Sequence, residues 1–271
     1  MSRRKNSFIG TILLLLLCLS ILLPVLILLL WIFTERWAWP ELLPQVYSLR
    51  ALREVLGRRA QLTQVFLSSI LISTVVGILS VFIGTLTSKA LVFYEFPGKR
   101  LIHFLTILPF MVPATVFAMG IQTTFIRLGL NNSSPGVILV HLICSLPYAV
   151  RLIMDGMEAA GGKLEEQARV LGASPAQTFR RVTLPILMPV LLSAMSMSYI
   201  VSFSQYFLTL LIGGGRVKTF TMIMVPYLQS GNRNIACIYS MIFLVITLAV
   251  FAVFDWIARK CVRSDSTDFY M

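Results

Sequence analysis

Charged side chains are scarce in this sequence, and their scarcity decides the solvent in which the protein folds. Only 13% of the 271 residues are Asp, Glu, Lys or Arg, whereas 57% are hydrophobic. A soluble domain carries about 25% charged residues and about 45–50% apolar ones. The composition therefore excludes an ordinary soluble domain and indicates an integral membrane protein.

Groups that ligate metals or catalyse reactions are also few and dispersed. The chain has 11 acidic residues, 2 histidines and 4 cysteines, and the cysteines show neither metal-ligand nor C-x-x-C spacing. His103 and His141 stand alone within apolar runs, where we expect each to bond to a neighbouring helix. No group of these residues has catalytic spacing. We predict a protein that is not an enzyme and binds neither metal nor cofactor.

Phosphate-binding and nucleic-acid-binding signals are missing as well. Gly213 to Gly215 do not belong to a G-x-x-x-x-G-K-[ST] pattern, and they follow an apolar run instead of a strand. The chain is therefore not expected to bind ATP by itself. Its net charge of +12 does not indicate nucleic acid, because the basic residues are spread along the chain instead of clustering on one face. Anionic membrane lipid is the expected partner of these charges.

Long uncharged stretches dominate what the sequence does contain. Each exceeds the roughly 20 residues that span a bilayer as a helix, and a helix satisfies its own backbone polar groups. They predict an all-α polytopic membrane protein with six transmembrane helices. The six runs are Asn6 to Thr34, Ala60 to Ser88, Leu101 to Ile126, Leu128 to Val150, Val182 to Gly215, and Asn234 to Phe254.

The basic residues orient these spans. An even number of spans places both termini on one side, and the basic residues at 3–5 and 259–263 mark that side as the cytoplasm. The arginines between residues 36 and 59 fall outside, where an amphipathic helix against the headgroups is expected. The first run is longer than the roughly 7–15 residues of a signal-peptide core, so we expect it to be retained. The parts are then an N-terminal helix with an external segment (1–59), a five-helix core (60–258) and a cytoplasmic tail (259–271).

A polar, well-punctuated segment separates the fourth and fifth runs on the cytoplasmic side. Residues 163–171 favour a short helix, because Glu165 and Glu166 near its start complement the helix dipole. Gly172 supplies the backbone freedom that ends this helix. Ser174 and Pro175 restart a helix, Gln177 completes a capping box, and Leu184-Pro185 is expected to close this second helix before the next span. This order favours a docking element over an ordinary connecting loop, although composition fits both.

The spacing of one motif in this segment points to a known family. Glu166-Gln167-Ala168, Gly172 and Leu184-Pro185 fit the pattern EAA, three residues, G, nine residues, I, one residue, LP, with Gln167 in place of the usual Ala and Val182 in place of Ile. The chain thus resembles the membrane-spanning permease subunits of binding-protein-dependent ABC importers. The run SFSQYFLTLLIGGG and the six-span topology resemble this family too, especially its permeases for polyamines, ferric iron, thiamine and phosphonates.

The resemblance implies a type I ABC importer permease with a cytoplasmic coupling loop at 156–186. In that family a short helix of the loop enters a cleft of the ATP-binding subunit. The implied partners are two copies of that subunit, a second permease subunit expected to be a homologue, and an extracytoplasmic solute-binding protein, at a bacterial inner membrane. Glu166 is implied as the charged contact, Gly172 as an elbow, and Leu184-Pro185 as the link to the fifth span. The candidate coupling residues are Glu166, Gln167, Ala168, Gly172, Ser174, Leu184 and Pro185.

Polar side chains within the spans are candidates for lining a translocation path, since such groups are costly toward lipid. Tyr199, Ser202 and Tyr206 recur at i, i+3 and i+7 and so share a face of one helix. Small hydroxyl residues also hold helices together, so a packing role stays open. The prolines at 109 and 113 are expected to kink the third run. The candidate lining residues are Gln122, Tyr199, Ser202, Gln205 and Tyr206.

The expected activity is import of a small charged solute, driven by ATP hydrolysis on the partner subunit. The alternative is a self-sufficient secondary transporter or channel. That class is expected to show inverted repeats and carboxylates within the membrane. The sequence shows no such repeat, and only Asp155 and Asp255 lie near span ends.

The topology predicts which lysines a membrane-impermeant reagent can reach. Lys5, Lys99, Lys163 and Lys260 should react only from the cytoplasmic side, and Lys218 only from outside, because six spans separate them in this order. Amine labelling of right-side-out and inverted vesicles measures this. Modification of residues 36–59 by an arginine-directed reagent from the cytoplasmic side would overturn the scheme, since the first run would then not cross.

Overall fold

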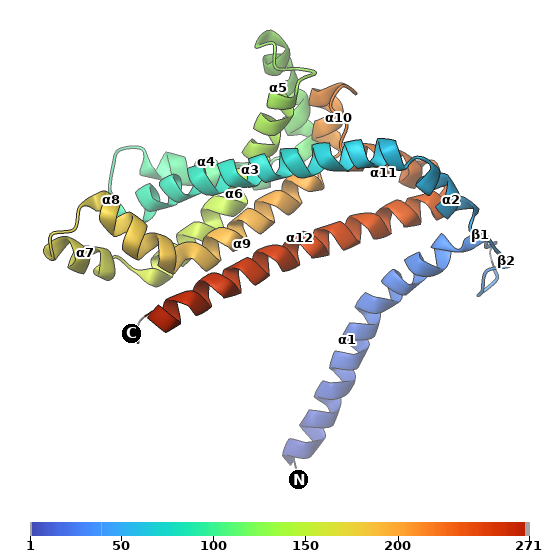
Figure 1. The fold of residues 1–271 in the computed structure, drawn as a ribbon, viewed down its shortest axis with the longest axis horizontal. Helices are drawn as coiled ribbons and strands as arrows, with labels where there is room; N and C mark the ends of the chain where they lie inside the picture. Colours follow the sequence, from blue (N-terminus) through green and yellow to red (C-terminus); the bar gives the residue numbers. More distant parts are fainter. Residues whose placement is uncertain (1, 39, 269–271) are drawn as a thin grey trace. The chain divides into compact units, whose positions relative to one another are not determined.

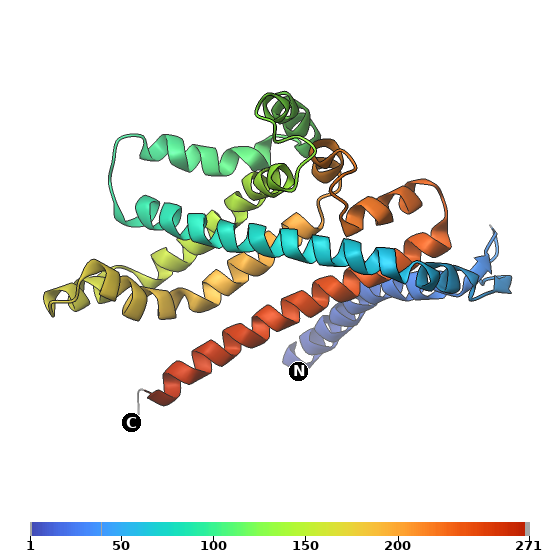
Figure 2. The same ribbon diagram turned by 45° about the horizontal axis from the view of Figure 1, so that its top comes forward.

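The computed structural model describes residues 2–38 and 40–268, most of which are helical (Figures 1 and 2). Two short strands form one antiparallel pair near the start of the chain. The elements are α1 (Ser2–Ile32), β1 (Thr34–Arg36), β2 (Val46–Tyr47), α2 (Arg50–Gly57), α3 (Arg59–Phe93), α4 (Lys99–Met111), α5 (Ala114–Arg127), α6 (Ser134–Ala160), α7 (Lys163–Val170), α8 (Pro175–Thr178), the π-helical turn η1 (Phe179–Thr183), α9 (Leu184–Phe203), α10 (Phe207–Gly213), α11 (Phe220–Gln229) and α12 (Arg233–Asp268).

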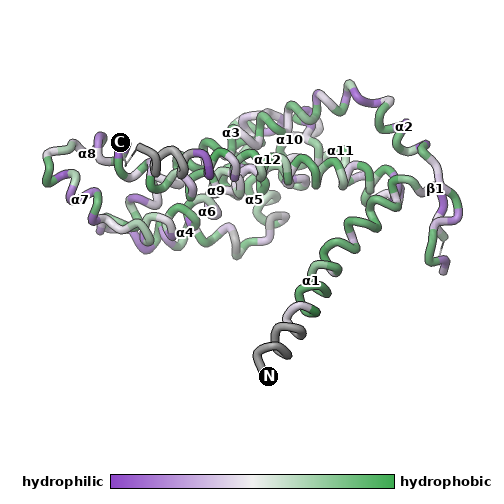
Figure 3. The backbone as a smooth tube through the Cα atoms, turned by 60° about the horizontal axis from the view of Figure 1, so that its bottom comes forward, coloured by the Kyte–Doolittle hydropathy of each residue, from purple (hydrophilic) through white to green (hydrophobic). Residues whose placement is uncertain are grey.

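Within the described residues, 5 helical stretches are long and apolar enough to cross a membrane, and the shorter apolar helix α11 accompanies them. Hydrophobic residues run along α1 in the part that Figure 3 colours by hydropathy. The prediction of a polytopic helical membrane protein is therefore confirmed. The spanning stretches are Gly10–Ile32, Arg59–Phe93, Ser134–Ala160, Pro175–Phe203 and Arg233–Lys260.

The third predicted run is two helices and not one kinked helix. α4 ends at Met111 and α5 begins at Ala114, so the pieces have 13 and 14 residues. Each is shorter than the roughly 20 residues of a continuous span. Val112 between them is extended, at φ −97° and ψ 124°, because the ring of Pro113 disfavours a helical conformation in the residue before it. Pro109 lies inside α4 without ending it.

The helical stretch that corresponds to the fifth predicted run begins and ends earlier in the chain than the run itself. We expected Leu184 and Pro185 to close a short helix, but they do not. α8, η1 and α9 form one continuous helical stretch from Pro175 to Phe203. A proline inside a helix removes a donor and clashes with the preceding turn. The wide turn of η1 ends at Thr183, just before Leu184 and Pro185. There the Leu184 N–H donates to the carbonyl of Phe179, five residues back. The run ends at Phe203, and α10 is a separate helix.

The chain divides into two compact units, of which the larger comprises residues 64–222 and 247–271. Its centre is the pairing of α6 with α9, whose apolar side chains form one buried cluster around Ile153, Met157 and Leu187. Gly156 of α6 permits the close approach, because a Cβ there would lie 2.8 Å from Cγ1 of Val190. Small residues at such contacts are typical of helices packed in membranes.

The smaller unit comprises residues 1–63 and 223–246. Trp31 stacks on Trp37 with ring centroids 5.0 Å apart, and the guanidinium of Arg58 donates to the hydroxyl of Tyr227 at 2.8 Å. The amphipathic helix expected between residues 36 and 59 corresponds to α2, whereas the hairpin of β1 and β2 was not foreseen. The division at residues 59 and 258 stays a prediction, and residues 269–271 of the expected tail lie outside the described residues.

Candidate functional site

The segment from α7 through η1, called here the coupling segment (residues 163–183), folds as its capping residues dictate. α7 begins at Lys163 and ends at Val170, with both glutamates in its first turn. The chain then reverses at Gly172, whose φ of +88° is the left-handed conformation that side chains with a Cβ rarely adopt. The Gly172 N–H donates to the carbonyl of Arg169 at 2.9 Å and closes the helix end. The predicted elbow conformation is confirmed.

The capping box of α8 is also confirmed. The Gln177 N–H donates to Oγ of Ser174 at 3.3 Å, and the Ser174 N–H donates to Oε1 of Gln177 at 3.0 Å. Pro175 occupies the first turn, where its missing N–H leaves no backbone hydrogen bond unmade. Two backbone donors are thus satisfied by local side chains, so this exposed helix start needs no contact with the rest of the protein.

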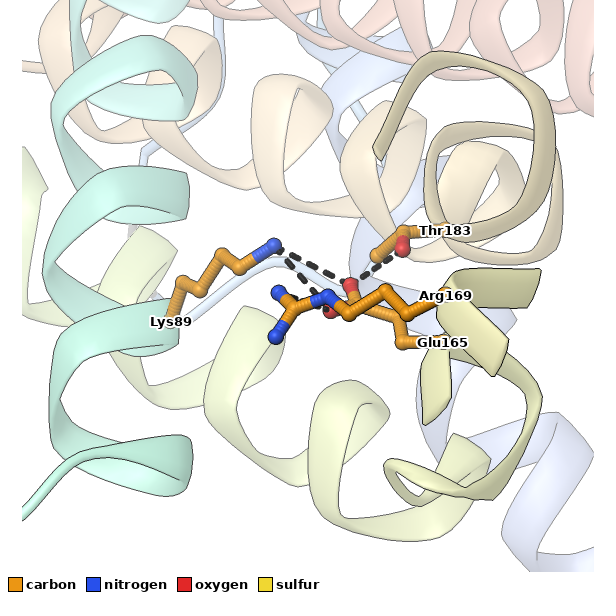
Figure 4. A network of polar contacts seen from close by, with 4 residues as sticks. All are labelled: Lys89, Glu165, Arg169 and Thr183. Atoms are coloured by element: carbon orange, nitrogen blue, oxygen red, sulfur yellow. Dashed lines mark hydrogen bonds and ion pairs between the residues drawn. The ribbon is translucent and has the colours of Figure 1, made fainter. Parts of the chain in front are cut away.

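One carboxylate ties the coupling segment to the membrane helices (Figure 4). Glu165 of α7 accepts from Nζ of Lys89 on α3, at 3.0 Å to Oε1 and 3.3 Å to Oε2. The hydroxyl of Thr183 in η1 also donates to Oε1, and Nη2 of Arg169 lies 3.7 Å from Oε2. Only 12% of the Glu165 side chain and 19% of the Lys89 side chain are exposed. The network therefore joins α3, α7 and η1 through a largely desolvated ion pair.

The charge of Glu165 is maintained by these partners. Burial raises the pKa of its carboxyl, but the hydrogen bonds from Thr183 and Lys89 and the charges of Lys89 and Arg169 outweigh burial and lower the pKa below its usual range. The folded-state pKa thus lies below the unfolded value of about 4.3. The stabilisation is full above that value and is lost as the pH falls through the folded-state pKa. At neutral pH the network is intact.

Lys89 makes one further contact, since its Nζ lies 5.0 Å from the centre of the Phe179 ring in η1. Sequence reasoning missed the role of Lys89 and Glu165. The pair of Glu165 with Arg169 is visible as an i, i+4 spacing, but Lys89 lies 76 residues from Glu165 and no local pattern connects them. The Glu165 side chain faces inward, against Lys89 of α3.

The opposite face of α7 is open. Glu166 and Gln167 are exposed, and Ala168 is half-buried. Val170 and Leu171, at the turn, are 87% and 88% exposed. Large apolar side chains exposed to this degree outside the membrane are typical of a surface that another protein covers. Ser174 is exposed beside them, while Leu184 and Pro185 are half-buried at the start of α9.

The residues expected to line a translocation path separate into two groups. Tyr199 and Ser202 are each 2% exposed and packed inside the chain: the Tyr199 ring stacks on Phe203 at 5.7 Å, and Ser202 bonds to His141. We expected Tyr206 to share their helix face, and that prediction is wrong. α9 ends at Phe203, and residues 204–206 interrupt the helix. The other group, Gln122, Gln205 and Tyr206, is half-buried.

Comparison with known proteins identifies the chain. Residues 79–263 match the model of the family described as the binding-protein-dependent transport system inner membrane component. The chain belongs to this family. It is a permease subunit of an ABC importer, and the alternative of a self-sufficient secondary transporter or channel is set aside.

Similar proteins support the same assignment. The permease is 29% identical to the molybdate/tungstate transport system permease protein WtpB of Pyrococcus abyssi, over 71% of this chain and 77% of the relative. It is 24% identical to the spermidine/putrescine transport system permease protein PotC of Haemophilus influenzae, over 73% and 77%. A chain of the bacterial alginate ABC transporter crystallised with its alginate-bound periplasmic protein has the same fold, with a TM-score of 0.71, 14% identity and coverage of 95% and 96%.

Removing the charge of Glu165 is expected to loosen the coupling segment. Glu165→Gln leaves the ammonium of Lys89 without a counter-charge, which costs roughly 3–5 kcal/mol at a fully buried site and less here because Lys89 is 19% exposed. Trypsin should then cleave the purified permease faster at Arg169 and Arg180. The double variant Lys89→Met/Glu165→Leu should be cleaved more slowly than Glu165→Gln, because no buried charge is left unpaired.

The matched control for this experiment is Glu95→Gln, which neutralises an 89% exposed carboxylate that forms an i, i+4 pair with Lys99. It should leave the cleavage rate near that of the unsubstituted permease, because exposed pairs contribute about 0–1 kcal/mol. Equal cleavage of Glu165→Gln and the unsubstituted protein would contradict an anchoring role for the network.

A Cβ at the elbow is expected to disturb the segment through the backbone alone. The position has open space around it, so Gly172→Val suffers no clash but must hold a left-handed conformation at a cost of about 1–2 kcal/mol. It should accumulate in the membrane normally and retain less ATPase subunit on purification. Gly172→Asn is the control, because Asn tolerates this conformation better. If valine and asparagine behave alike, the elbow conformation is not what matters.

Proposed function

We propose that the permease couples to its ATPase through the open face of α7 and the turn after it. The observation that carries this proposal is the near-complete exposure of Val170 and Leu171 beside Glu166, on a segment whose other face is tied down by Glu165. An apolar pair next to a charge is suited to a protein cleft with a basic group at its rim. Lipid is a poor occupant, because the proposed topology places this segment beyond the cytoplasmic end of α6 and most of its residues are polar.

Each candidate coupling residue then has a physical role. Glu166 makes a charge-assisted hydrogen bond to a basic group of the ATPase, and Gln167 extends the polar contact. Ala168 allows α7 to lie close to its own turn, since the Ala173 N–H donates to its carbonyl at 3.0 Å. Gly172 and Ser174 set the angle between α7 and α8. Leu184 and Pro185 carry the displacement into α9.

The segment is suited to transmit force in both directions. Lys89 connects it to α3, and the continuous helix from Pro175 connects it to α9. ATP-driven closure of two ATPase subunits draws two such segments together, one from this permease and one from a second, homologous permease. The helix bundles then alternate between inward-facing and outward-facing states, provided that ATP binding favours one state over the other. Hydrolysis takes place on the ATPase, and the permease itself carries out no chemistry.

The remaining partners follow from the same family. An extracytoplasmic binding protein delivers the solute, and the proposed location is a bacterial inner membrane that the chain crosses several times. Similar permeases are named for the transport of molybdate or tungstate, sulfate, spermidine or putrescine, and ferric ion. These are small ions of both signs, so a small charged solute is the proposed cargo. Gln122, Gln205 and Tyr206 are proposed to face its path.

Substitutions on the open face should uncouple the importer without unfolding it. Glu166→Ala removes a charge-assisted contact of about 1.5–3 kcal/mol and should weaken ATPase binding by roughly tenfold to a hundredfold. Leu171→Asp should weaken it as well, because a charge replaces an apolar contact. Both variants should insert normally, since neither side chain packs against the bundle. The measurements are membrane yield, the ATPase retained on purification, and the salt dependence of that binding.

Glu158→Ala is the matched control, because Glu158 is an exposed carboxylate at the end of α6 and lies outside the proposed surface. It should bind the ATPase as the unsubstituted permease does. If Leu171→Asp alone is defective, docking is apolar and the role of Glu166 is wrong. If neither variant is defective, the coupling surface lies elsewhere.

A further inference from the structure

The helix interruption at residues 204–206 lies in an apolar stretch, so its backbone groups need partners within the protein. An unsatisfied backbone polar group in lipid costs several kcal/mol. The Gln205 N–H donates to the Ser202 carbonyl at 3.2 Å. The Gln205 carbonyl accepts from the hydroxyls of Thr209 at 2.9 Å and Thr221 at 3.0 Å. Two donors occupy both lone pairs of this carbonyl, so the orientation of the peptide is well defined.

His141 of α6 bridges the two sides of this interruption. Its Nδ1 lies 3.0 Å from Oγ of Ser202, in the last turn of α9, and its Nε2 lies 2.9 Å from Oγ1 of Thr209, in the first turn of α10. The imidazole is 1% exposed. One side chain therefore holds the end of one helix and the start of the next at a set separation.

The hydrogen-bond directions define the tautomer. Thr209 donates its only hydroxyl proton to the Gln205 carbonyl, so it can only accept from His141. Nε2 consequently carries the proton, and Nδ1 accepts from the hydroxyl of Ser202. The neutral imidazole fits this chain of bonds with one donor and one acceptor. We refer to His141, Ser202 and Thr209 as the brace.

Gln205, whose carbonyl accepts from Thr209 of the brace, lines a cavity of about 190 Å³ at which two helix interruptions meet. Pro109 and Val112, from the break between α4 and α5, line one side, and Gln205 lines the other. Cys144 and Tyr148 of α6 complete the wall. Interrupted helices at membrane depth are tolerated where they line a cavity, and transporters use them to present backbone and side-chain polar groups to solute.

We infer that His141 is a positioning residue of the translocation path: the brace holds the interruption between α9 and α10 open and thereby keeps Gln205 at the wall of this cavity. The inference rests on the proposed function of Gln205 in facing the path. Among the described residues that line the cavity, none is Asp, Glu, Lys or Arg. The cavity therefore offers the solute a neutral wall, in which the amide of Gln205 is the proposed hydrogen-bonding group, and leaves the recognition of charge to the binding protein.

Cys144 offers a native probe of this cavity. The test uses the permease purified with its ATPase, with Cys18, Cys237 and Cys261 replaced by serine, and measures the reaction rate of Cys144 with N-ethylmaleimide. His141→Leu removes both bonds of the brace and should raise the rate about tenfold, the factor expected when two hydrogen bonds that oppose local opening are lost. His141→Gln should stay near the unsubstituted rate, because an amide supplies one acceptor and one donor.

Ser80→Ala is the matched control, because it removes a buried hydroxyl contact of the same kind, between Ser80 and Ser145 at 2.9 Å, that does not touch the interruption. It should leave the rate unchanged. Should His141→Leu fail to accumulate, the pair Ser202→Ala and Thr209→Val removes both bonds to His141 and also the bond from Thr209 to the Gln205 carbonyl, and it is expected to raise the rate at least as much. Unchanged rates in these variants, or a rise as large in Ser80→Ala, would overturn the brace.

A separate measurement addresses the path itself. In the permease with an unsubstituted brace, Cys144 should react with N-ethylmaleimide at different rates in the nucleotide-free complex and in the complex with ATP and vanadate. The reason is that access to the path changes during transport. If this rate is the same in both states while His141→Leu still raises it, Gln205 does not face the path. The proposed function of Gln205 is then wrong, and the inference that rests on it fails as well. If the states differ but His141→Leu has no effect, the path stands and the positioning role of His141 is wrong.

Discussion

The inability of lipid to solvate a backbone N–H or carbonyl governs this structure more than any single side chain does. A continuous helix meets that requirement without help, but the permease interrupts its helices at residues 112–113 and 204–206 and widens one into a π-helical turn at 179–183. Each interruption at membrane depth must be compensated by the protein itself, whereas the π-helical turn lies in the coupling segment, where Arg180 and Arg181 are exposed. At 204–206 the compensation comes from Thr209, Thr221 and the brace. The interruptions are therefore built into the packing and are not points of weakness.

The ion pair of Lys89 and Glu165 answers a similar demand at the membrane boundary. Both side chains are largely removed from water, and such a pair contributes little stability compared with apolar residues of the same size. What it provides is specificity, because an unpaired charge at either position is costly. α7 is thereby kept in one orientation relative to α3, with Glu165 inward and Glu166 outward. Two adjacent carboxylates on one helix are given different roles by which of them has a partner.

Local rules predicted much of the architecture, and long-range contacts account for most of what they missed. The apolar runs, the left-handed Gly172 and the capping box of Ser174 follow from spacing and from backbone geometry within a few residues. The end of α9 at Phe203 carries no proline and no glycine, so the run looked continuous to Gly215. Its interruption depends on contacts with Thr221 and His141. These lie 16 and 64 residues from Gln205 in the sequence, and no local pattern connects them with it. The sequence predicted that His141 bonds to a neighbouring helix, but it did not predict Ser202 and Thr209 as the partners.

The two sites are connected by one element. The helical stretch Pro175–Phe203 has 29 residues, which at 1.5 Å per residue is about 40 Å, comparable with the thickness of a bilayer including its headgroups. It begins in the coupling segment, directly after the capping residue Ser174, and it ends at Phe203, one residue after Ser202 of the brace. A rigid helix delivers a displacement of one end to the other, whereas a flexible loop would absorb it. The π-helical turn close to its cytoplasmic end is the place where this helix departs from regular geometry, and such turns are frequent at functional positions. Motion imposed by an ATPase on α7 and α8 would thus arrive at residues 204–206, where the hydroxyls of Thr209 and Thr221 hold the Gln205 carbonyl in a set orientation.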